Sequence, residues 1–330
     1  MAAKLMRAVQ YDRYGGGAAA LQHVEVPVPS PKKDELLLKV EAASLNPADW
    51  KIQEGIMRPL VPWKFPCIPG TCVAGEVAEV GSGVTTFKAG DKVIAMLKFW
   101  NGGALAQFVV SGVKLTAHRP PEVSATEGAG MPIASLTALL GLRSFGVKFD
   151  GTDNPANILV TAASGGVGHY AVQLAKLAGL HVTATCGARN IELVKSLGAD
   201  EVLDYRTQEG KSLTSPSGHK YDIVINCAHG MPWSVLEPNL SDNGKVADVS
   251  PTAGDALTFA VTKVTFSKKQ RFPIMLFPSE KARDLEFLIG LAKEKKLKTV
   301  IDSIFPLAKA EDAFARIVEG HATGKIIVEM

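Results

Sequence analysis

The sequence predicts an α/β protein with two domains, one all-β and barrel-like and one built on a doubly wound parallel sheet. Residues up to about 125 contain many short strand patterns with turn residues between them. From about residue 132 onward, strand and helix patterns alternate instead, as they do in parallel sheets. Within that second region, residues 157–168 run from a strand through a glycine turn directly into the start of a helix, with no additional loop residues.

The first region predicts a barrel because its strand patterns are short and its turns are rich in glycine and proline. Residues 29–31, 81–83 and 90–91 mark three of these turns. Examples of the expected strands are residues 36–40, 73–80, 92–96 and 106–110.

The second region favours a parallel sheet with helices on its faces. Its expected strands span residues 157–162, 182–186, 201–205, 223–228 and 245–249, with a sixth near 260–266. The pattern after residue 268 predicts a helix over 280–295, a strand over 299–305, a helix over 308–318 and a last strand over 325–328. We expect this tail to rejoin the first domain. Residues 130–272 would then be an inserted nucleotide-binding domain, and residues 1–129 and 273–330 would form the other domain.

The glycine turn predicts a binding site for a diphosphate. Its pattern is close to GxGxxG, with Ala163 in the position of the first glycine. Glycines let the backbone approach phosphates, and the amides of a helix's first turn point at them with the positive end of the dipole. The alternative is a buried glycine turn without a nucleotide, but a second strand follows the helix as a dinucleotide site requires. The expected cofactor contacts are Ser164, Gly165, Gly166, Val167 and Gly168.

The end of the second strand favours NADPH over NADH. An NAD site usually has Asp or Glu there to bind both ribose hydroxyls, but this chain reads Cys186-Gly187-Ala188-Arg189. The Arg189 guanidinium could hold a 2′-phosphate through two donors. A solvated surface arginine is the alternative. Cys186, Arg189 and Tyr205, which ends the third strand, are expected to flank the adenosine half of the cofactor.

Composition excludes several classes of protein. The chain has 330 residues, 46% of them apolar, and a net charge of +3. No nucleic-acid recognition motif is present, and no apolar run is long enough to span a bilayer. The four cysteines form no CxxC pair, so a reducing compartment fits better than a disulfide framework. The N-terminus runs straight into a strand-like pattern, and no cleavable leader is expected.

Several segments resemble the medium-chain dehydrogenase/reductase superfamily, and within it the zinc-free quinone oxidoreductase branch. They read SLNPADWK at 44–51, FPCIPG at 65–70, FKAGDKV at 87–93, AASGGVG at 162–168, LGADEVLDY at 197–205 and HATGKIIV at 321–328. The resemblance covers the whole chain and implies a GroES-like barrel domain and a Rossmann domain. The chain is also similar to plant chloroplast envelope members of the branch. That similarity implies a peripheral location at the plastid inner membrane, and a homodimer is common in such folds.

The same positions predict that no metal is bound. The GHE segment of the superfamily's zinc enzymes reads Gly70-Thr71-Cys72 here, and their first zinc cysteine falls near Asn46. The structural zinc lobe has no counterpart. Tetrahedral zinc needs three or four converging ligands, and the cysteines and histidines of this chain lack that spacing. We expect Cys72 to be a small buried residue.

Without a metal, the expected reaction is hydride transfer from NADPH to an electron-poor carbon. The resemblance implies a small hydrophobic carbonyl or quinone as substrate, bound between the domains. Candidates are quinones, alkenals, enones and lipid-derived γ-ketols. The protein must hold the two reactants together and place donors near the carbonyl oxygen, where negative charge develops. The alternative is a nucleotide-binding protein with vestigial catalysis that acts by associating with a membrane or a partner.

Catalytic candidates lie in residues 44–63, which the resemblance places beside the nicotinamide. Asn46 could donate to the ribose or carboxamide. Lys51 is expected to donate to a cofactor phosphate or to the developing enolate. Asp49 could orient Lys51 or relay a proton, and a surface ion pair between the two is the alternative. Trp50, Met57 and Trp63 either line an apolar pocket or pack in the core.

Two later turns follow strands at the carboxyl edge of the expected sheet, where ligands bind. Cys227 and Ser250 begin these turns and are expected to contact the cofactor, and the resemblance adds Lys325 from the last strand. His229 is expected to be a loop residue. Residues 268–277 combine a basic cluster with an apolar run. They either cover the cofactor or meet a membrane, with Lys268, Lys269 and Arg271 on lipid headgroups and Phe272 and Met275 inserted.

Overall fold

The computed structural model describes residues 4–56, 58, 64–98, 102–151, 156–252, 254, 259, 263, 268–274 and 282–330. The chain divides into two compact units. Unit 1 comprises Met1–Ala134 with Phe277–Met330, and unit 2 comprises Ser135–Leu276. The finer domain limits at residues 130 and 272 stay a prediction.

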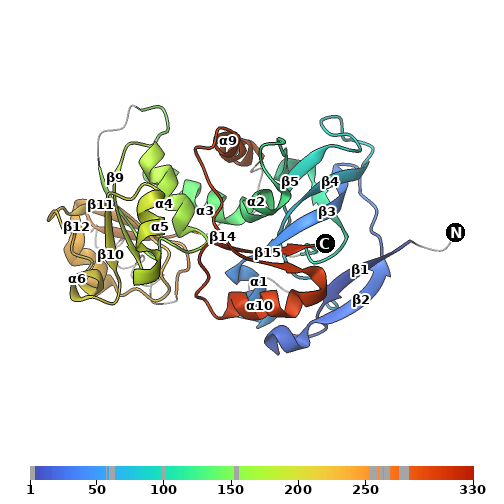
Figure 1. Ribbon diagram of the computed structural model, residues 1–330, viewed down its shortest axis with the longest axis horizontal. Coiled ribbons are helices and arrows are strands. Elements are labelled where there is room, and N and C mark those ends of the chain that lie inside the picture. The colour runs from blue at the N-terminus through green and yellow to red at the C-terminus, as the bar shows by residue number, and fades with distance from the viewer. Residues whose placement is uncertain are drawn as a thin grey trace. The chain divides into compact units, whose positions relative to one another are not determined.

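Unit 1 is built on a seven-stranded sheet, which confirms the barrel-like, β-rich class. Its order is β14-β15-β3-β4-β5-β7, and β6 pairs with β3. β14 and β15 are parallel, whereas the other pairs are antiparallel (Figure 1). The strands are β3 (Glu35–Leu45), β4 (Cys72–Val80), β5 (Lys92–Met96), β6 (Phe108–Gly112), β7 (Thr116–His118), β14 (Ile301–Pro306) and β15 (Lys325–Glu329). A separate hairpin pairs β1 (Leu5–Gln10) with β2 (Gln22–Pro27).

The core of unit 1 forms where the apolar faces of these strands meet one amphipathic helix. Leu36 and Leu38 of β3 and Val93 of β5 are fully buried. Phe314 of α10 packs in the same cluster. The last residues of the chain therefore complete a core that residues near the start begin. The helices of unit 1 are α1 (Pro47–Gln53), α2 (Ala125–Gly130), α9 (Ala282–Lys293) and α10 (Ala310–Val318), and α3 (Pro132–Arg143) crosses into unit 2.

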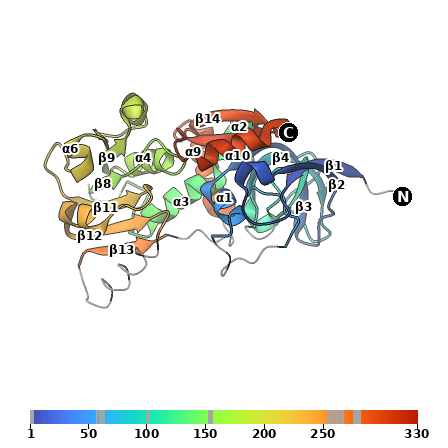
Figure 2. The same ribbon diagram turned by 90° about the horizontal axis from the view of Figure 1, so that it is seen from below.

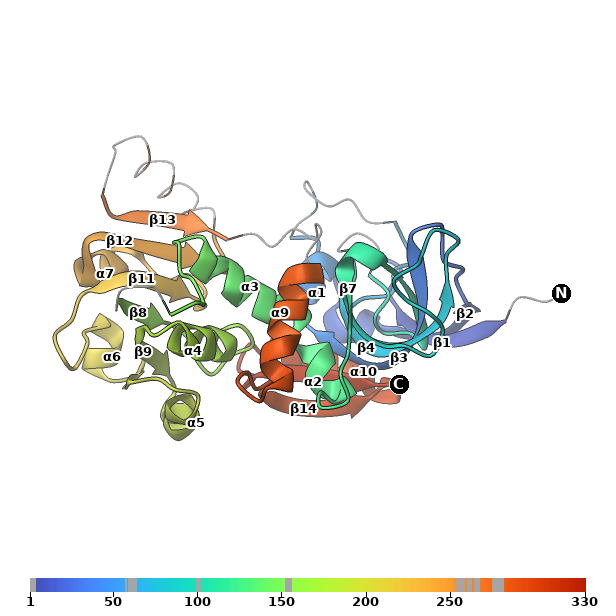
Figure 3. The ribbon, with the colours of Figure 1, turned by 90° about the horizontal axis from the view of Figure 1, so that it is seen from above.

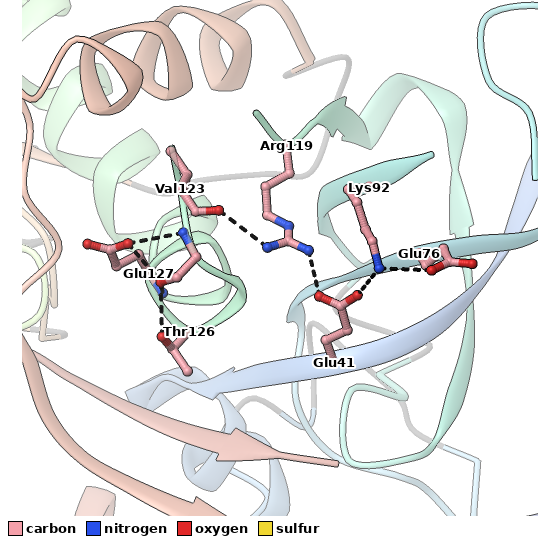
Figure 4. Close-up of polar contacts among 8 residues, drawn as sticks. Glu41, Glu76, Lys92, Arg119, Val123, Thr126 and Glu127 are labelled. Carbon is pink, nitrogen blue, oxygen red and sulfur yellow. Dashed lines mark hydrogen bonds and ion pairs between the residues drawn. The ribbon is translucent and has the colours of Figure 1, made fainter. Parts of the chain in front are cut away.

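A chain of ion pairs ties four strand segments of unit 1 together (Figure 4). Lys92 on β5 bridges Glu41 on β3 and Glu76 on β4, with Nζ–O distances of 2.5 and 2.8 Å. Arg119, just after β7, reaches the other oxygen of Glu41 at 2.5 Å and donates to the Val123 carbonyl. Residue 124 follows directly and caps α2, so this network fixes where α2 begins.

Unit 2 is a six-stranded, wholly parallel sheet, which confirms the doubly wound class. Its order is β10-β9-β8-β11-β12-β13. Figure 2 labels β8, β9, β11, β12 and β13 of this sheet. The chain starts in the middle, moves to one edge and then crosses to the other side, as in dinucleotide-binding sheets. The strands are β8 (Asn157–Val160), β9 (His181–Cys186), β10 (Glu201–Asp204), β11 (Tyr221–Asn226), β12 (Leu240–Asp248) and β13 (Gln270–Pro273).

The sixth strand lies later than the sequence predicts. β13 occupies 270–273, whereas most of 260–266 lies outside the described residues, and Lys263 within that range is helical. Residues 260–266 are rich in β-branched residues, and local propensity favours a strand there. The actual strand contains a buried arginine instead, whose partner is distant in sequence.

Helices α4 (Gly168–Leu177) and α5 (Ile191–Ser196) pack against β8, β9 and β10 (Figure 3). Gly179 follows the end of α4 with φ of 81°, a left-handed conformation that ends helices and suits glycine. The other short elements are α6 (Gln208–Ser212), α7 (Trp233–Leu236), the 3-10 turn η3 (Ala188–Asn190) and the 3-10 turn η4 (Glu237–Asn239).

Candidate functional site

The glycine turn of unit 2 is a tight reversal between β8 and α4. Ala162 has φ of 45°, and its carbonyl accepts the N–H of Gly165 at 2.9 Å. A Cβ on Gly168 would lie 2.3 Å from that same carbonyl oxygen and 2.7 Å from the Cα of Ala163. Only glycine fits at position 168, because both neighbours are backbone atoms that cannot move away.

This geometry suits a diphosphate. α4 has ten residues and begins at Gly168, so the amides of its first turn lie at the glycine turn. The N-terminal turn of a helix leaves backbone donors without partners inside the helix, and the dipole favours an anion there. The predicted contacts Ser164, Gly165, Gly166, Val167 and Gly168 all belong to this turn.

The segment after β9 is joined to the glycine turn by a side-chain hydrogen bond. Asn190, at the end of η3, donates from Nδ2 to Ser164 Oγ at 3.0 Å. Arg189 lies in the same 3-10 turn and is exposed. Tyr205 follows β10, is 45% exposed and lies against Gly187, where a Cβ would be 3.4 Å from the ring. The residues predicted to hold the adenosine half therefore gather at one edge of unit 2.

A carboxylate also lies at this edge, on a strand that the motif does not cover. Asp204 of β10 lies opposite Cys186 in the parallel ladder. Its Oδ1 accepts the N–H of Arg206 at 3.0 Å. Burial, together with the charge of Asp204, raises the pKa of the Cys186 thiol to about 11. The end of β9 itself has no acid, but its neighbour does, so the choice between NADPH and NADH depends on more than residues 186–189.

Four buried polar residues form a continuous network across the carboxyl ends of β8, β11, β12 and β13. Thr161 donates to Asn226 Oδ1 at 2.6 Å, and Asn226 donates to Asp248. Asp248 in turn pairs with both Nε and Nη2 of Arg271, and Arg271 also donates to the Met231 carbonyl. Arg271 and Asp248 are each 1% exposed. Arg271 therefore holds the sheet together, and its predicted contact with lipid headgroups is wrong.

The turn residues after β11 and β12 lie where the sequence predicts them, at this edge of the sheet. The backbone N–H groups of Cys227 and Ala228 donate to the hydroxyl of Thr161 at 3.0 and 3.1 Å. Cys227 can therefore serve a cofactor through its carbonyl or thiol rather than through its amide. Ser250 is half-buried just beyond β12, and His229 is exposed in its loop.

In unit 1 the predicted catalytic segment is a helix. Within residues 44–63, residues 47–53 form α1. Asn46 and Asp49 form a capping box, in which the Asn46 N–H donates to Asp49 Oδ2 at 2.7 Å. This N-cap–Pro–x–Asp pattern is a recognised helix start that could have been read from the sequence. Asp49 is 3% exposed, so a surface ion pair with Lys51 is wrong.

The capping box meets a buried lysine from the last strand. Lys325 on β15 donates to Asn46 Oδ1 at 2.6 Å and to the Leu45 carbonyl at 3.2 Å, and it is 3% exposed. The amide of Asn46 lies 3.5 Å from Cys72 Sγ, and Thr71 Oγ1 lies 3.4 Å from Asp49 Oδ1. The structure thus gathers three predicted site residues, Asn46, Asp49 and Lys325, into one cluster with Thr71 and Cys72.

Burial dominates the electrostatics of this cluster. It raises the pKa of Asp49 to about 6, although the Asn46 N–H and the charge of Lys325 favour the carboxylate. Burial lowers the pKa of Lys325 and raises that of the Cys72 thiol to about 11. Cys72 is fully buried, as predicted, and its raised pKa keeps the thiol neutral. With a pKa of about 6, Asp49 can take up and release a proton near neutral pH, which suits a proton donor.

Lys51 lies on a different side of α1 from Asp49, because residues two apart on a helix do not face each other. Its ammonium lies 6.0 Å from the ring centre of Trp50, and burial lowers its pKa. Trp50 packs against the core of unit 1. Met57 and Trp63 lie outside the described residues.

No group of three or more His, Cys, Asp or Glu side chains among the described residues could hold a metal ion. No helix in the described part of the chain is long and apolar enough to cross a membrane.

We expect the stability of the protein to depend on pH through Asp49. Its pKa lies at about 6 in the folded protein, above the ordinary value of 3.8. The folded state therefore binds this proton more tightly than the unfolded state. The resulting stability is present below pH 4 and is lost as the pH rises through 6. The uncharged Asp49→Asn variant lacks this loss.

Between pH 4 and 7 the free energy of unfolding of the wild type should fall by about 2 kcal/mol relative to Asp49→Asn. Urea unfolding of both proteins at four pH values measures this difference. A difference that stays constant with pH would contradict the buried, titrating carboxylate.

Comparison with known proteins agrees with both units. Residues 32–121 match the family model of the alcohol dehydrogenase GroES-like domain, and residues 197–328 match that of the zinc-binding dehydrogenases. The chain is 66% identical to the chloroplast envelope quinone oxidoreductase homolog of Arabidopsis thaliana, over all of both chains. It is 35% identical to the chloroplastic NADPH-dependent alkenal/one oxidoreductase of Arabidopsis thaliana, covering 98% of this chain and 80% of that one. The quinone oxidoreductase structure from Coxiella burnetii superposes with a TM-score of 0.86 at 30% identity, covering 99% of this chain and 100% of that one.

A GroES-like unit combined with a parallel-sheet unit that carries a dinucleotide turn defines an oxidoreductase that uses a nicotinamide cofactor. The chain belongs to the medium-chain dehydrogenase/reductase superfamily, among the quinone oxidoreductase homologues.

Proposed function

We propose that this protein is an NADPH-dependent reductase that works without zinc and transfers hydride to α,β-unsaturated carbonyls or quinones. The observation that carries the proposal is the buried cluster of Asn46, Asp49 and Lys325. It combines an amide donor, an acid with a pKa of about 6 and a buried lysine within one unit. These groups can stabilise a carbonyl oxygen that becomes negative and can supply a proton. The alkenal/one oxidoreductase among the relatives supports this substrate class.

The residues of unit 2 suit the cofactor's diphosphate. The turn 164–168 would hold it at the start of α4, where Gly168 keeps the backbone within reach. When bound, the reduced nicotinamide supplies a hydride to the electron-poor carbon. Ser164, fixed by Asn190, keeps the turn and the segment of Arg189 in one arrangement.

In unit 1 we assign two roles. The amide group of Asn46 donates to the substrate's carbonyl oxygen, where the enolate's negative charge develops. Asp49, whose pKa of about 6 lets it take up and release a proton near neutral pH, is the source of the proton that the α-carbon needs after hydride addition, and Thr71 lies beside it. Lys51 is a second, half-buried cation on the same helix and remains a candidate contact for cofactor phosphate or enolate.

Arg189 should select NADPH. Replacing Arg189 with alanine removes a charged double donor, so the Kd for NADPH is expected to rise by about 10- to 100-fold and that for NADH to change by less than about threefold. Fluorescence titration of the reduced cofactors measures both. Lys220→Ala, at the amino end of β11, is the matched control and should change neither. Equal losses for both cofactors would remove this role from Arg189.

Turnover tests the function itself. The purified protein should oxidise NADPH with enones, alkenals, γ-ketols or quinones, followed at the cofactor's absorbance band. Added zinc or a chelator should not change the rate. Tight NADPH binding without turnover on any acceptor would favour the alternative of vestigial catalysis.

We also propose that the protein associates peripherally with a plastid envelope membrane. Its support is the similarity to relatives named for the chloroplast and its envelope. Among the residues considered for this contact, Lys268 is exposed, whereas Lys269 donates to the Glu237 carbonyl. The Phe272 ring packs near Phe145 and Phe259. Met275 lies outside the described residues. Sedimentation with anionic vesicles at low and high salt tests the association. If the protein binds the vesicles at neither salt concentration, the association is excluded.

A further inference from the structure

Lys325 is a costly residue to bury. A lysine ammonium carries three donors and loses its hydration in the interior, so it needs acceptors there. The structure gives it two oxygens, the Leu45 carbonyl and Asn46 Oδ1, and both belong to the entry into α1. The stem of Lys325 passes Gly130 of α2, where a Cβ would lie 3.4 Å from Lys325 Cγ. The fold thus leaves room for this side chain and aims its charge at the capping box.

The ammonium fixes the orientation of the Asn46 amide. Because an ammonium only donates, Asn46 must turn its oxygen toward Lys325 and its NH₂ group away. That NH₂ group has long contacts of 3.5 Å with the Ser44 carbonyl and with Cys72 Sγ. Hydrogen bonds of that length are weak. The amide is therefore held firmly at its oxygen and keeps donor capacity at its nitrogen.

The same ammonium is the cation that acts on Asp49. The titratable groups that face this carboxylate are Lys325, Cys72, Cys67 and Tyr11. Burial raises the pKa of both thiols to about 11 and raises that of the tyrosine, so all three stay neutral at physiological pH. Lys325 is the member of this set that favours the ionised form of Asp49.

We propose that Lys325 is a positioning residue that acts through Asn46 and Asp49, and that it does not bind the cofactor. This replaces the prediction that Lys325 contacts the cofactor, and it rests on the proposed reductase function. Lys325 presents the Asn46 nitrogen to the substrate oxygen and holds the proton of Asp49 within the range in which it can be given up and regained.

Three variants test the two effects of Lys325. Lys325→Met removes the donor and the charge at nearly equal length, Lys325→Gln is a second neutral variant should the first fail to fold, and Lys325→Arg keeps both features. Lys296→Met is the matched control, because Lys296 is an exposed lysine of the same unit, paired with Glu294.

The first readout needs no turnover. In Lys325→Met the pH midpoint of the Asp49-dependent change in thermal stability should rise by about one unit, since an opposite charge near a carboxylate lowers its pKa by 1–3 units. Lys325→Arg should stay near the wild type. The change should vanish in a background that carries Asp49→Asn. An unchanged midpoint in both neutral variants would overturn the proposal.

The second readout separates positioning from cofactor binding. We expect kcat/KM for an enone to fall by about 100-fold in Lys325→Met, as for loss of one oriented donor, with the Kd for NADPH within about threefold of the wild type. A tenfold or greater loss of NADPH affinity without a change in the pH midpoint would make Lys325 a cofactor ligand and overturn the proposal. A wild type inactive on every acceptor would defeat the proposed function instead, while the pH midpoint would still report on Lys325.

Discussion

Replacing Arg271 with methionine is expected to lower the thermal midpoint of the protein by about 10 °C. The change leaves Asp248 as a buried, unpaired charge, which typically costs about 3–5 kcal/mol, and each kcal/mol shifts the midpoint by about 2–4 °C in a domain of this size. The Met231 carbonyl loses its donor as well. Differential scanning calorimetry measures the midpoint.

Two controls make the Arg271 prediction specific. Lys268→Met removes an exposed cation three residues earlier and should leave the midpoint unchanged. The double variant Arg271→Met/Asp248→Leu removes both charges and should recover much of the loss, because no orphaned carboxylate remains. A midpoint within about 3 °C of the wild type in Arg271→Met would show that the ion pair contributes little, contrary to the geometry.

Replacing Gly168 with alanine is expected to weaken NADPH binding by about 100-fold, the effect of misplacing a binding group by about 1 Å. The added methyl group would lie 2.3 Å from the Ala162 carbonyl oxygen, so the start of α4 must move away from the turn. Fluorescence titration measures the affinity, and circular dichroism checks that the fold persists.

Gly290→Ala is the matched control for Gly168. Gly290 lies in α9, and a Cβ there would meet no atom within 4 Å. Alanine at that position should leave NADPH affinity unchanged and stabilise the helix by about 1 kcal/mol. NADPH affinity within threefold of the wild type in Gly168→Ala would show that the turn does not carry the cofactor.

The fold was predictable where local pattern decides structure. Short strand patterns between turn residues identified β3, β4 and β5, and the glycine turn identified β8 and α4. β13 could not be found this way. Its four residues include Arg271, which is stable in a strand only because Asp248 lies on the neighbouring strand.

In the candidate site, too, contacts within a local motif were predictable, whereas contacts between distant segments were not. Residues 164–168 and Arg189 follow from a motif whose spacing is local, and the structure brings their segments together through Ser164 and Asn190. The contact of Lys325 with Asn46 joins residues 279 positions apart, and no local sequence pattern in either segment predicts it. The polar network of Thr161, Asn226 and Asp248 was also missed, although each residue stands at or beside the carboxyl end of a strand.

The pairing of β15 with β3 has a consequence for biosynthesis. Residues 42–45 pair with residues 326–329, which are translated long after them. Unit 2 is one continuous stretch and can fold as soon as it is translated, whereas the GroES-like unit waits for the final strand. A nascent chain that has not yet reached residue 325 would therefore expose the unpaired side of β3, and an exposed strand edge can pair with another chain.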